Sequence, residues 1–70
     1  MRNNLRKARL EAGLTQEKVA EMLDISLRYY QNIEAGERSG SFRIWDALED
    51  LFKVHQRVLR EIHPGKADSQ

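Results

Sequence analysis

The feature that most limits how this chain can fold is a very short link between two predicted helices. Thr15 and Ser26 are residue types that cap helix N-termini well, and each precedes apolar residues at helical spacing. Only residues 23–25 separate the helix that begins at Thr15 from Ser26, so the chain must turn sharply. Ala20 is small enough for the helices to cross closely, and Ile25 closes the turn. This pattern indicates a helix-turn-helix unit, whose second helix can lie in a DNA major groove.

Five short helices are predicted, because glycine, proline and capping residues divide the chain and no stretch alternates as a strand would. Gly13 stands where a left-handed residue would end the first helix, and Ser41 caps the fourth. The predicted helices cover about residues 4–12, 15–23, 26–35, 42–52 and 56–62, and the second and third ranges include their N-cap residues. Their apolar faces predict one core of Leu5, Ala8, Ala12, Leu14, Val19, Ala20, Leu23, Tyr30, Ile33, Trp45, Leu48, Leu51, Phe52, Val58, Leu59 and Ile62. We expect a compact all-α domain of residues 1–62 and a disordered tail of residues 63–70.

The composition fits one small folded domain and argues against an enzyme. Seventy residues, 40% of them hydrophobic, can form one core but leave little material for a closed cleft. The chain has no cysteine, and its two histidines lack the spacing of metal ligands, so we expect no metal and no cofactor. No apolar run reaches the roughly 18 residues of a membrane span, and the basic N-terminus lacks the apolar stretch of a signal peptide. We therefore expect a cytoplasmic protein.

The polar face of the helix at 27–35 carries groups that can read DNA bases. The chain has 12 basic and 11 acidic residues, so a basic surface must arise from separation of charges rather than from an excess. At 100° per residue, Arg28 and Asn32 lie opposite Tyr30. Arginine can bind guanine and asparagine can bind adenine through two hydrogen bonds, each pair discriminating by about 1–3 kcal/mol, and Leu27 can contact a thymine methyl group. The alternative is an ordinary solvated helix face.

Two stretches of the chain carry motifs that are specific in combination. They are Leu-Thr-Gln-Glu-Lys-Val-Ala-Glu-Met-Leu-Asp-Ile-Ser at 14–26 and Tyr-Gln-Asn-Ile-Glu-Ala-Gly at 30–36. In these stretches, and over about residues 4–60, the chain resembles the Cro/C1-type (XRE) helix-turn-helix family of phage and bacterial repressors. The resemblance implies a five-helix, lambda-repressor-like DNA-binding domain that binds double-stranded operator DNA as a two-fold homodimer.

The resemblance also implies roles for individual residues. Gln16 matches a glutamine that contacts a phosphate at the start of the first motif helix. Arg9 and Glu34 match a buried ion pair between the first helix and the recognition helix, although two independent surface charges are the alternative. The base-reading positions match Leu27, Arg28 and Asn32, with Gln31 on their flank.

Other side chains near helix N-termini, or in the loop after the third helix, are suited to phosphates. For Tyr29, a phosphate contact through the hydroxyl and a place on the rim of the core are both open. For Trp45 we expect a place in the core or in a dimer interface rather than against a base. The full set of predicted phosphate contacts is Gln16, Lys18, Tyr29, Arg38 and Arg43.

Four positions depart from the pattern of the family. Asp24 occupies the position of the turn glycine, which predicts strain in the turn. Gly40 replaces a proline before the fourth helix, Glu49 replaces a small residue in that helix, and Lys53 replaces a glycine after it. The region of the fourth helix is therefore the least conventional part of the chain.

We expect a sequence-specific DNA-binding transcriptional regulator, a repressor, that inserts the helix at 27–35 into the major groove. No membrane and no small-molecule ligand are expected as partners. The alternative is a protein-interaction module on the same fold, such as an antitoxin-like or regulator-binding subunit. The apolar residues that could serve such a partner, or a dimer equally well, are Trp45, Phe52, Val54, Val58, Leu59 and Ile62.

Overall fold

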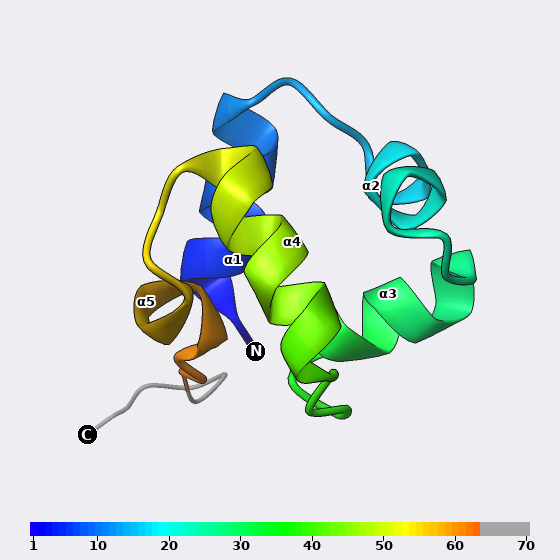
Figure 1. Ribbon diagram of the computed structural model, residues 1–70. Helices are drawn as coiled ribbons and strands as arrows, with labels where there is room; N and C mark the ends of the chain where they lie inside the picture. Colours follow the sequence, from blue (N-terminus) through cyan, green and yellow to red (C-terminus); the bar gives the residue numbers. More distant parts are fainter. Residues whose placement is uncertain (64–70) are drawn as a thin grey trace.

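The computed structural model describes residues 1–63, and within that range the chain forms five α-helices and no strand (Figure 1). The all-α, five-helix prediction is therefore confirmed. The helices are α1 (Asn3–Glu11), α2 (Gln16–Leu23), α3 (Leu27–Ala35), α4 (Phe42–Phe52) and α5 (Gln56–Arg60). None of these helices is long and apolar enough to cross a lipid bilayer. The tail predicted for residues 63–70 lies, apart from His63, outside the described residues.

Three helices begin at the hydroxyl caps that the sequence predicts. Thr15, Ser26 and Ser41 each accept a hydrogen bond from the backbone N–H three residues later, at 3.0, 3.0 and 3.3 Å. These bonds satisfy N–H groups that have no partner inside the helix. The boundaries of α2, α3 and α4 therefore follow from local chemistry.

Left-handed residues end the same three helices. Gly36 follows α3 with φ 88°, a conformation that glycine adopts readily. Asp24 after α2 and Lys53 after α4 also have positive φ, 59° in each case, although neither is a glycine. For such residues the left-handed conformation costs roughly 1–2 kcal/mol. The strain expected at Asp24 is thus present, and Lys53 shows the same feature.

The helices enclose one apolar core. In Figure 1, α4 runs through the middle of the view, with α5 on one side of it and the α2–α3 pair on the other. Helix α1 packs against α3 and α5, and α4 packs against α5. The buried apolar side chains are Leu5, Val19, Ala20, Leu23, Tyr30, Ile33, Ile44, Trp45, Leu48 and Leu59.

The predicted core is wrong at three positions and incomplete at one. Ala12 lies beyond the end of α1 and is exposed, while Val58 and Ile62 are also exposed. Ile44, which the prediction omits, is buried in the core. Ala8, Leu14, Leu51 and Phe52 are partly buried and pack against the edge of the core.

Helix α5 ends two residues earlier than predicted because the chain leaves it to pair with the N-terminus. The backbone N–H of His63 donates to the carbonyl of Met1 at 2.7 Å, and the Met1 ammonium donates back to the carbonyl of His63 at 2.9 Å. Glu61 has an extended backbone, with φ −56° and ψ 135°. Residues 61–63 are thereby held outside the helix, which leaves Ile62 exposed.

Gly40 provides a test of how the loop before α4 packs. A Cβ atom on Gly40 would lie 2.9 Å from Nε1 of Trp45, whose indole N–H donates to the carbonyl of Ser39 at 2.7 Å. Gly13 has a similar φ, 74° against 78°, but nothing within 4 Å of its Cβ position. We expect Gly13→Ala to lower the free energy of unfolding by about 1–2 kcal/mol through backbone strain alone. We expect Gly40→Ala to lower it by roughly a further 1–3 kcal/mol through overpacking.

Urea unfolding followed by circular dichroism measures both losses. Equal losses for the two variants would show that the contact with the indole ring has no energetic effect.

Candidate nucleic-acid interface

The turn between α2 and α3 is fixed by backbone hydrogen bonds and by packing. The N–H of Ile25 donates to the carbonyl of Ala20 at 3.0 Å, and the N–H of Asp24 donates to the carbonyl of Glu21 at 3.1 Å. Ala20 is buried, and Ile25 packs against the core. These contacts leave the two helices one relative orientation, so the exposed face of α3 has a defined direction.

A buried carboxylate on the inner face of α3 binds this helix to its neighbours. Glu34 is 1% exposed, and it forms an ion pair with Arg9 of α1 in which Nε lies 2.8 Å from Oε2 and Nη2 lies 3.2 Å from Oε1. The hydroxyl of Tyr30 donates to Oε2 at 2.8 Å, and the amide of Gln16 donates to Oε1 at 2.9 Å. We call these four residues the Glu34 network. It connects α1, α2 and α3 at a single carboxylate.

The Glu34 network keeps its carboxylate ionised. Burial by itself raises the pKa of Glu34, but the hydrogen bonds from Arg9, Tyr30 and Gln16 outweigh it and hold that pKa below its ordinary value. The hydrogen bond to Glu34 is also the main reason that the pKa of Arg9 is raised. Burial, reinforced by the nearby carboxylate, raises the pKa of Tyr30, so its hydroxyl remains a donor.

The opposite face of α3 carries the predicted base-reading residues. Leu27, Arg28 and Gln31 are exposed, and Asn32 is half-buried one turn after Arg28. Arg28 has no carboxylate within 4 Å among residues 1–63, so its guanidinium has no ionic partner there. Tyr29 is half-buried and packs against the core, as expected for a rim residue. Its hydroxyl forms no hydrogen bond within the described part of the chain.

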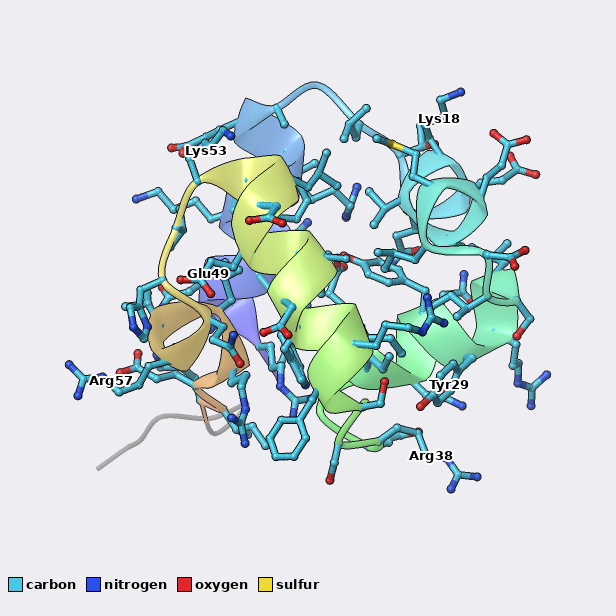
Figure 2. The ribbon with its side chains drawn as sticks, viewed as in Figure 1. Lys18, Tyr29, Arg38, Glu49, Lys53 and Arg57 are labelled. Atoms are coloured by element: carbon cyan, nitrogen blue, oxygen red, sulfur yellow. The ribbon has the colours of Figure 1, made fainter. Side chains whose placement is uncertain are left out.

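The predicted phosphate-contacting residues come from α2, α3, the loop after α3 and the first turn of α4. In Figure 2, Lys18, Tyr29 and Arg38 are on the side of the molecule formed by α2 and α3, whereas Lys53 and Arg57 are on the opposite side. Lys18 forms an exposed ion pair with Glu21 at 3.4 Å. Arg38, in the loop after α3, and Arg43, in the first turn of α4, are exposed and have no ionic partner among the described residues.

Gln16 joins the Glu34 network to the exposed face of α3. While its amide N–H₂ donates to Glu34, its oxygen accepts a hydrogen bond from the amide of Gln31 at 3.3 Å. The second N–H of the Gln16 amide has no partner among the described residues. This group lies in the first turn of α2, where backbone N–H groups also favour an anion.

Sequence reasoning missed Arg2. This side chain is 5% exposed and donates to backbone carbonyls of α3, of the loop after α3 and of α5. No sequence pattern could have indicated these contacts, because a backbone carbonyl is present at every position. The only signal was the position of Arg2 in a basic N-terminal stretch.

The apolar surface predicted for a protein partner is partly wrong. Trp45 is 2% exposed and Leu59 is fully buried, so neither can contact a partner. Phe52 and Val54 are half-buried against the core, and only Val58 and Ile62 are exposed. In residues 1–63, no cluster of histidine, aspartate and glutamate side chains could hold a metal ion.

Comparison with known proteins gives two matches. Residues 5–55 match a family model described as Helix-turn-helix (HTH_3). The chain is also 51% identical over 41 residues to a Bacillus subtilis (strain 168) protein named "Uncharacterized HTH-type transcriptional regulator YqaF". This match covers 59% of the chain and 54% of that protein, so the chain spans about half the length of the curated relative. No solved structure matches the chain significantly.

The lowered pKa of Glu34 predicts how stability depends on pH. Because the folded pKa is below the unfolded value of about 4.3, the carboxylate stabilises the fold above that pH, and the contribution is lost as pH falls through the folded pKa. We expect Glu34→Gln to lower the free energy of unfolding at neutral pH by about 3–5 kcal/mol, since Arg9 loses its ionic partner. The difference between wild type and variant should shrink below about pH 4.

Urea unfolding at several pH values, with an osmolyte present to keep the variant folded, measures this difference. Glu37→Gln, which removes an exposed carboxylate just after α3, is the matched control and should show little loss at any pH. A loss for Glu34→Gln that stays constant from neutral to acid pH would contradict the assignment of an ionised, buried Glu34.

Proposed function

The chain belongs to the helix-turn-helix family, which is not a family of enzymes, and on that premise we propose that it is a DNA-binding transcriptional regulator acting as a repressor. In this proposal, α3 lies in the major groove and reads the base sequence. One observation carries the proposal. Helix α3 has its inner face bound to two other helices through Glu34, while its outer face exposes Leu27, Arg28 and Gln31.

The proposed base contacts follow from the chemistry of the exposed face of α3. Arg28 can donate two hydrogen bonds to O6 and N7 of guanine. Asn32, four residues later on the same face, can bind an adenine in the same bidentate manner. Leu27 lies in the first turn beside Arg28 and can contact a thymine methyl group, and Gln31 supplies a further amide.

The proposed phosphate contacts fix the position of α3 along the groove. Gln16 and Lys18 lie in the first turn of α2, which precedes α3 in the sequence. Arg38 and Arg43 follow α3 in the sequence, in the loop after it and in the first turn of α4. Tyr29 comes from α3 itself and can donate to a phosphate through its hydroxyl. Such contacts orient a protein on DNA but carry no sequence information by themselves.

We further propose that the protein binds DNA as a homodimer. A single α3 can read one half-site only, whereas two copies related by two-fold symmetry would read half-sites about 34–36 Å apart. A dimer doubles the contacts without enlarging the domain. A dimeric repressor would act by occupying DNA that polymerase needs.

Selection of duplexes from a randomised DNA library, at near-physiological salt, tests the function directly. We expect enrichment of a two-fold symmetric site whose halves are separated by about one helical turn. Enrichment of a single half-site would retain DNA binding and contradict the homodimer. If the folded protein enriches no sequence, DNA binding is contradicted, and the alternative of a protein-interaction module takes its place.

Replacement of two side chains on α3 tests the assigned reading face. We expect Arg28→Ala with Asn32→Ala to remove about 1–3 kcal/mol of discrimination for each base pair contacted, with weak non-specific binding retained. The matched control is Arg57→Ala with Asn3→Ala, two exposed positions outside α3. The measurement is the dissociation constant for the selected site and for a scrambled duplex. Unchanged selectivity in the α3 variant would show that this face does not read the bases.

A further inference from the structure

Arg2 is a buried cation whose polar contacts, within residues 1–63, are backbone carbonyls and the face of an aromatic ring. Nη1 donates to the carbonyl of Ile33 at 2.5 Å and to that of Arg38 at 2.9 Å, and Nε donates to the carbonyl of Arg60 at 3.1 Å. The guanidinium carbon lies 5.1 Å from the centre of the Trp45 ring system. No carboxylate lies within 4 Å of Arg2 among residues 1–63.

This environment requires an arginine. Burial, with a smaller effect from the charge of Arg60, lowers the pKa of Arg2, so the hydrogen bonds to the guanidinium must offset the cost of burying it. What the site provides is three backbone carbonyl acceptors and the face of the Trp45 ring. A planar guanidinium with five donors fits that set, whereas the single ammonium of lysine does not.

Two of the three carbonyls that the Arg2 side chain binds belong to α3 and to the loop after it, next to the proposed DNA-binding face, and the third belongs to α5. Ile33 lies in the last turn of α3, and its carbonyl also accepts the backbone N–H of Gly36 at 3.1 Å. The backbone N–H of Arg2 also donates to the carbonyl of Glu34 at 2.8 Å. The main chain of Arg38 lies in the loop between α3 and α4, and its side chain is exposed to solvent.

The loop after α3 is also held by hydrogen bonds at its two ends. The N–H groups of Glu37 and Arg38 both donate to the carbonyl of Asn32, at 2.8 and 3.2 Å, which holds the start of the loop against α3. The carbonyl of Ser39 accepts the indole N–H of Trp45 and holds the end of the loop. Between these ends, the carbonyl of Arg38 accepts its hydrogen bond from Arg2, which holds the second polar group of the Arg38 backbone.

We propose that Arg2 is a positioning residue for DNA binding, which ties the loop after α3 to the end of that helix and thereby holds the Arg38 side chain where it contacts a phosphate. This inference rests on the proposed function and adds a residue to it that lies outside the helix-turn-helix motif. Arg2 itself is too deeply buried to contact DNA. Its effect on binding therefore passes through Arg38.

A double-mutant cycle on the salt dependence of DNA binding tests this role. Each protein–phosphate contact contributes about 0.9 to the slope of log Kd against log salt concentration. Arg38→Ala should lower the slope by about that amount, Arg2→Met should lower it similarly, and the double variant should show no further decrease. A merely structural role for Arg2 would reduce the folded fraction and weaken binding equally at all salt concentrations, with the slope unchanged.

Matched variants separate position from charge. Arg2→Lys keeps the charge and should behave as Arg2→Met does, whereas Arg6→Met removes an exposed arginine of α1 and should leave the slope as in wild type. Lys18→Ala should add its full effect in the Arg2→Met background, because Lys18 and Arg38 lie at opposite ends of the proposed face (Figure 2). Additive slopes for Arg2→Met and Arg38→Ala would overturn the proposal.

Amide hydrogen exchange of the free protein gives a second measurement that needs no DNA. In Arg2→Lys, the N–H groups of Glu37 and Arg38 should exchange faster than in wild type, while those of α2 should be unchanged. Unchanged exchange in the loop would overturn the positioning role even if DNA binding is established. If wild type selects no DNA but the loop exchanges faster in Arg2→Lys, the proposed function fails while the contact between Arg2 and the loop stands. The DNA-binding role of Arg2 would then be overturned as well.

Discussion

The interaction on which the rest of the structure depends is the one between the Glu34 carboxylate and its three donors. Arg9, Gln16 and Tyr30 come from three different helices, so the carboxylate sets how α1, α2 and α3 lie relative to one another. A core in a domain of this size provides only about 3–5 kcal/mol of net stability, so one buried charge without partners would be enough to unfold it. A buried ion pair is not the most stabilising way to fill this space. Its hydrogen bonds are directional, however, and an apolar contact would not fix the orientation of α3 in the same way.

Helix α3 has one face that packs against the rest of the domain and another that carries the proposed DNA-reading residues. Tyr30 and Glu34, four residues apart, are buried, and Arg28 and Asn32, also four residues apart, lie on the other side. Because the inner pair is held by hydrogen bonds, the outer pair is presented by a backbone that has little freedom left to lose on binding. Side chains placed in this way make binding less costly in conformational entropy than side chains on a mobile segment. This relation links the stability of the domain to its proposed recognition of DNA.

The parts of the fold that the sequence predicted depend on neighbouring residues, and the parts it missed depend on distant ones. The caps at Thr15, Ser26 and Ser41 involve an N–H three residues away, so the residue type alone indicates them. The pairing of Arg9 with Glu34 was suggested by family resemblance and by the inward side of α3. In contrast, α5 ends at Arg60 because of contacts with Met1, which no local pattern encodes. Arg2 was missed for the same reason, since its acceptors are carbonyls 31 to 58 residues away.

The charges at the two ends of α3 agree with the proposal that its first turn meets DNA. Its last turn has no basic residue of its own, and Arg2 supplies a cation there from the N-terminal segment. A positive charge at this end complements the negative pole of the helix. The first turn has no acidic residue, so nothing within α3 neutralises its positive pole, and Arg28 adds a further positive charge. A chain with nearly equal numbers of acidic and basic residues can thus present a positive potential at one helix end. Binding to a phosphate backbone depends on positive charge where the two molecules meet, so the protein does not need a high net charge.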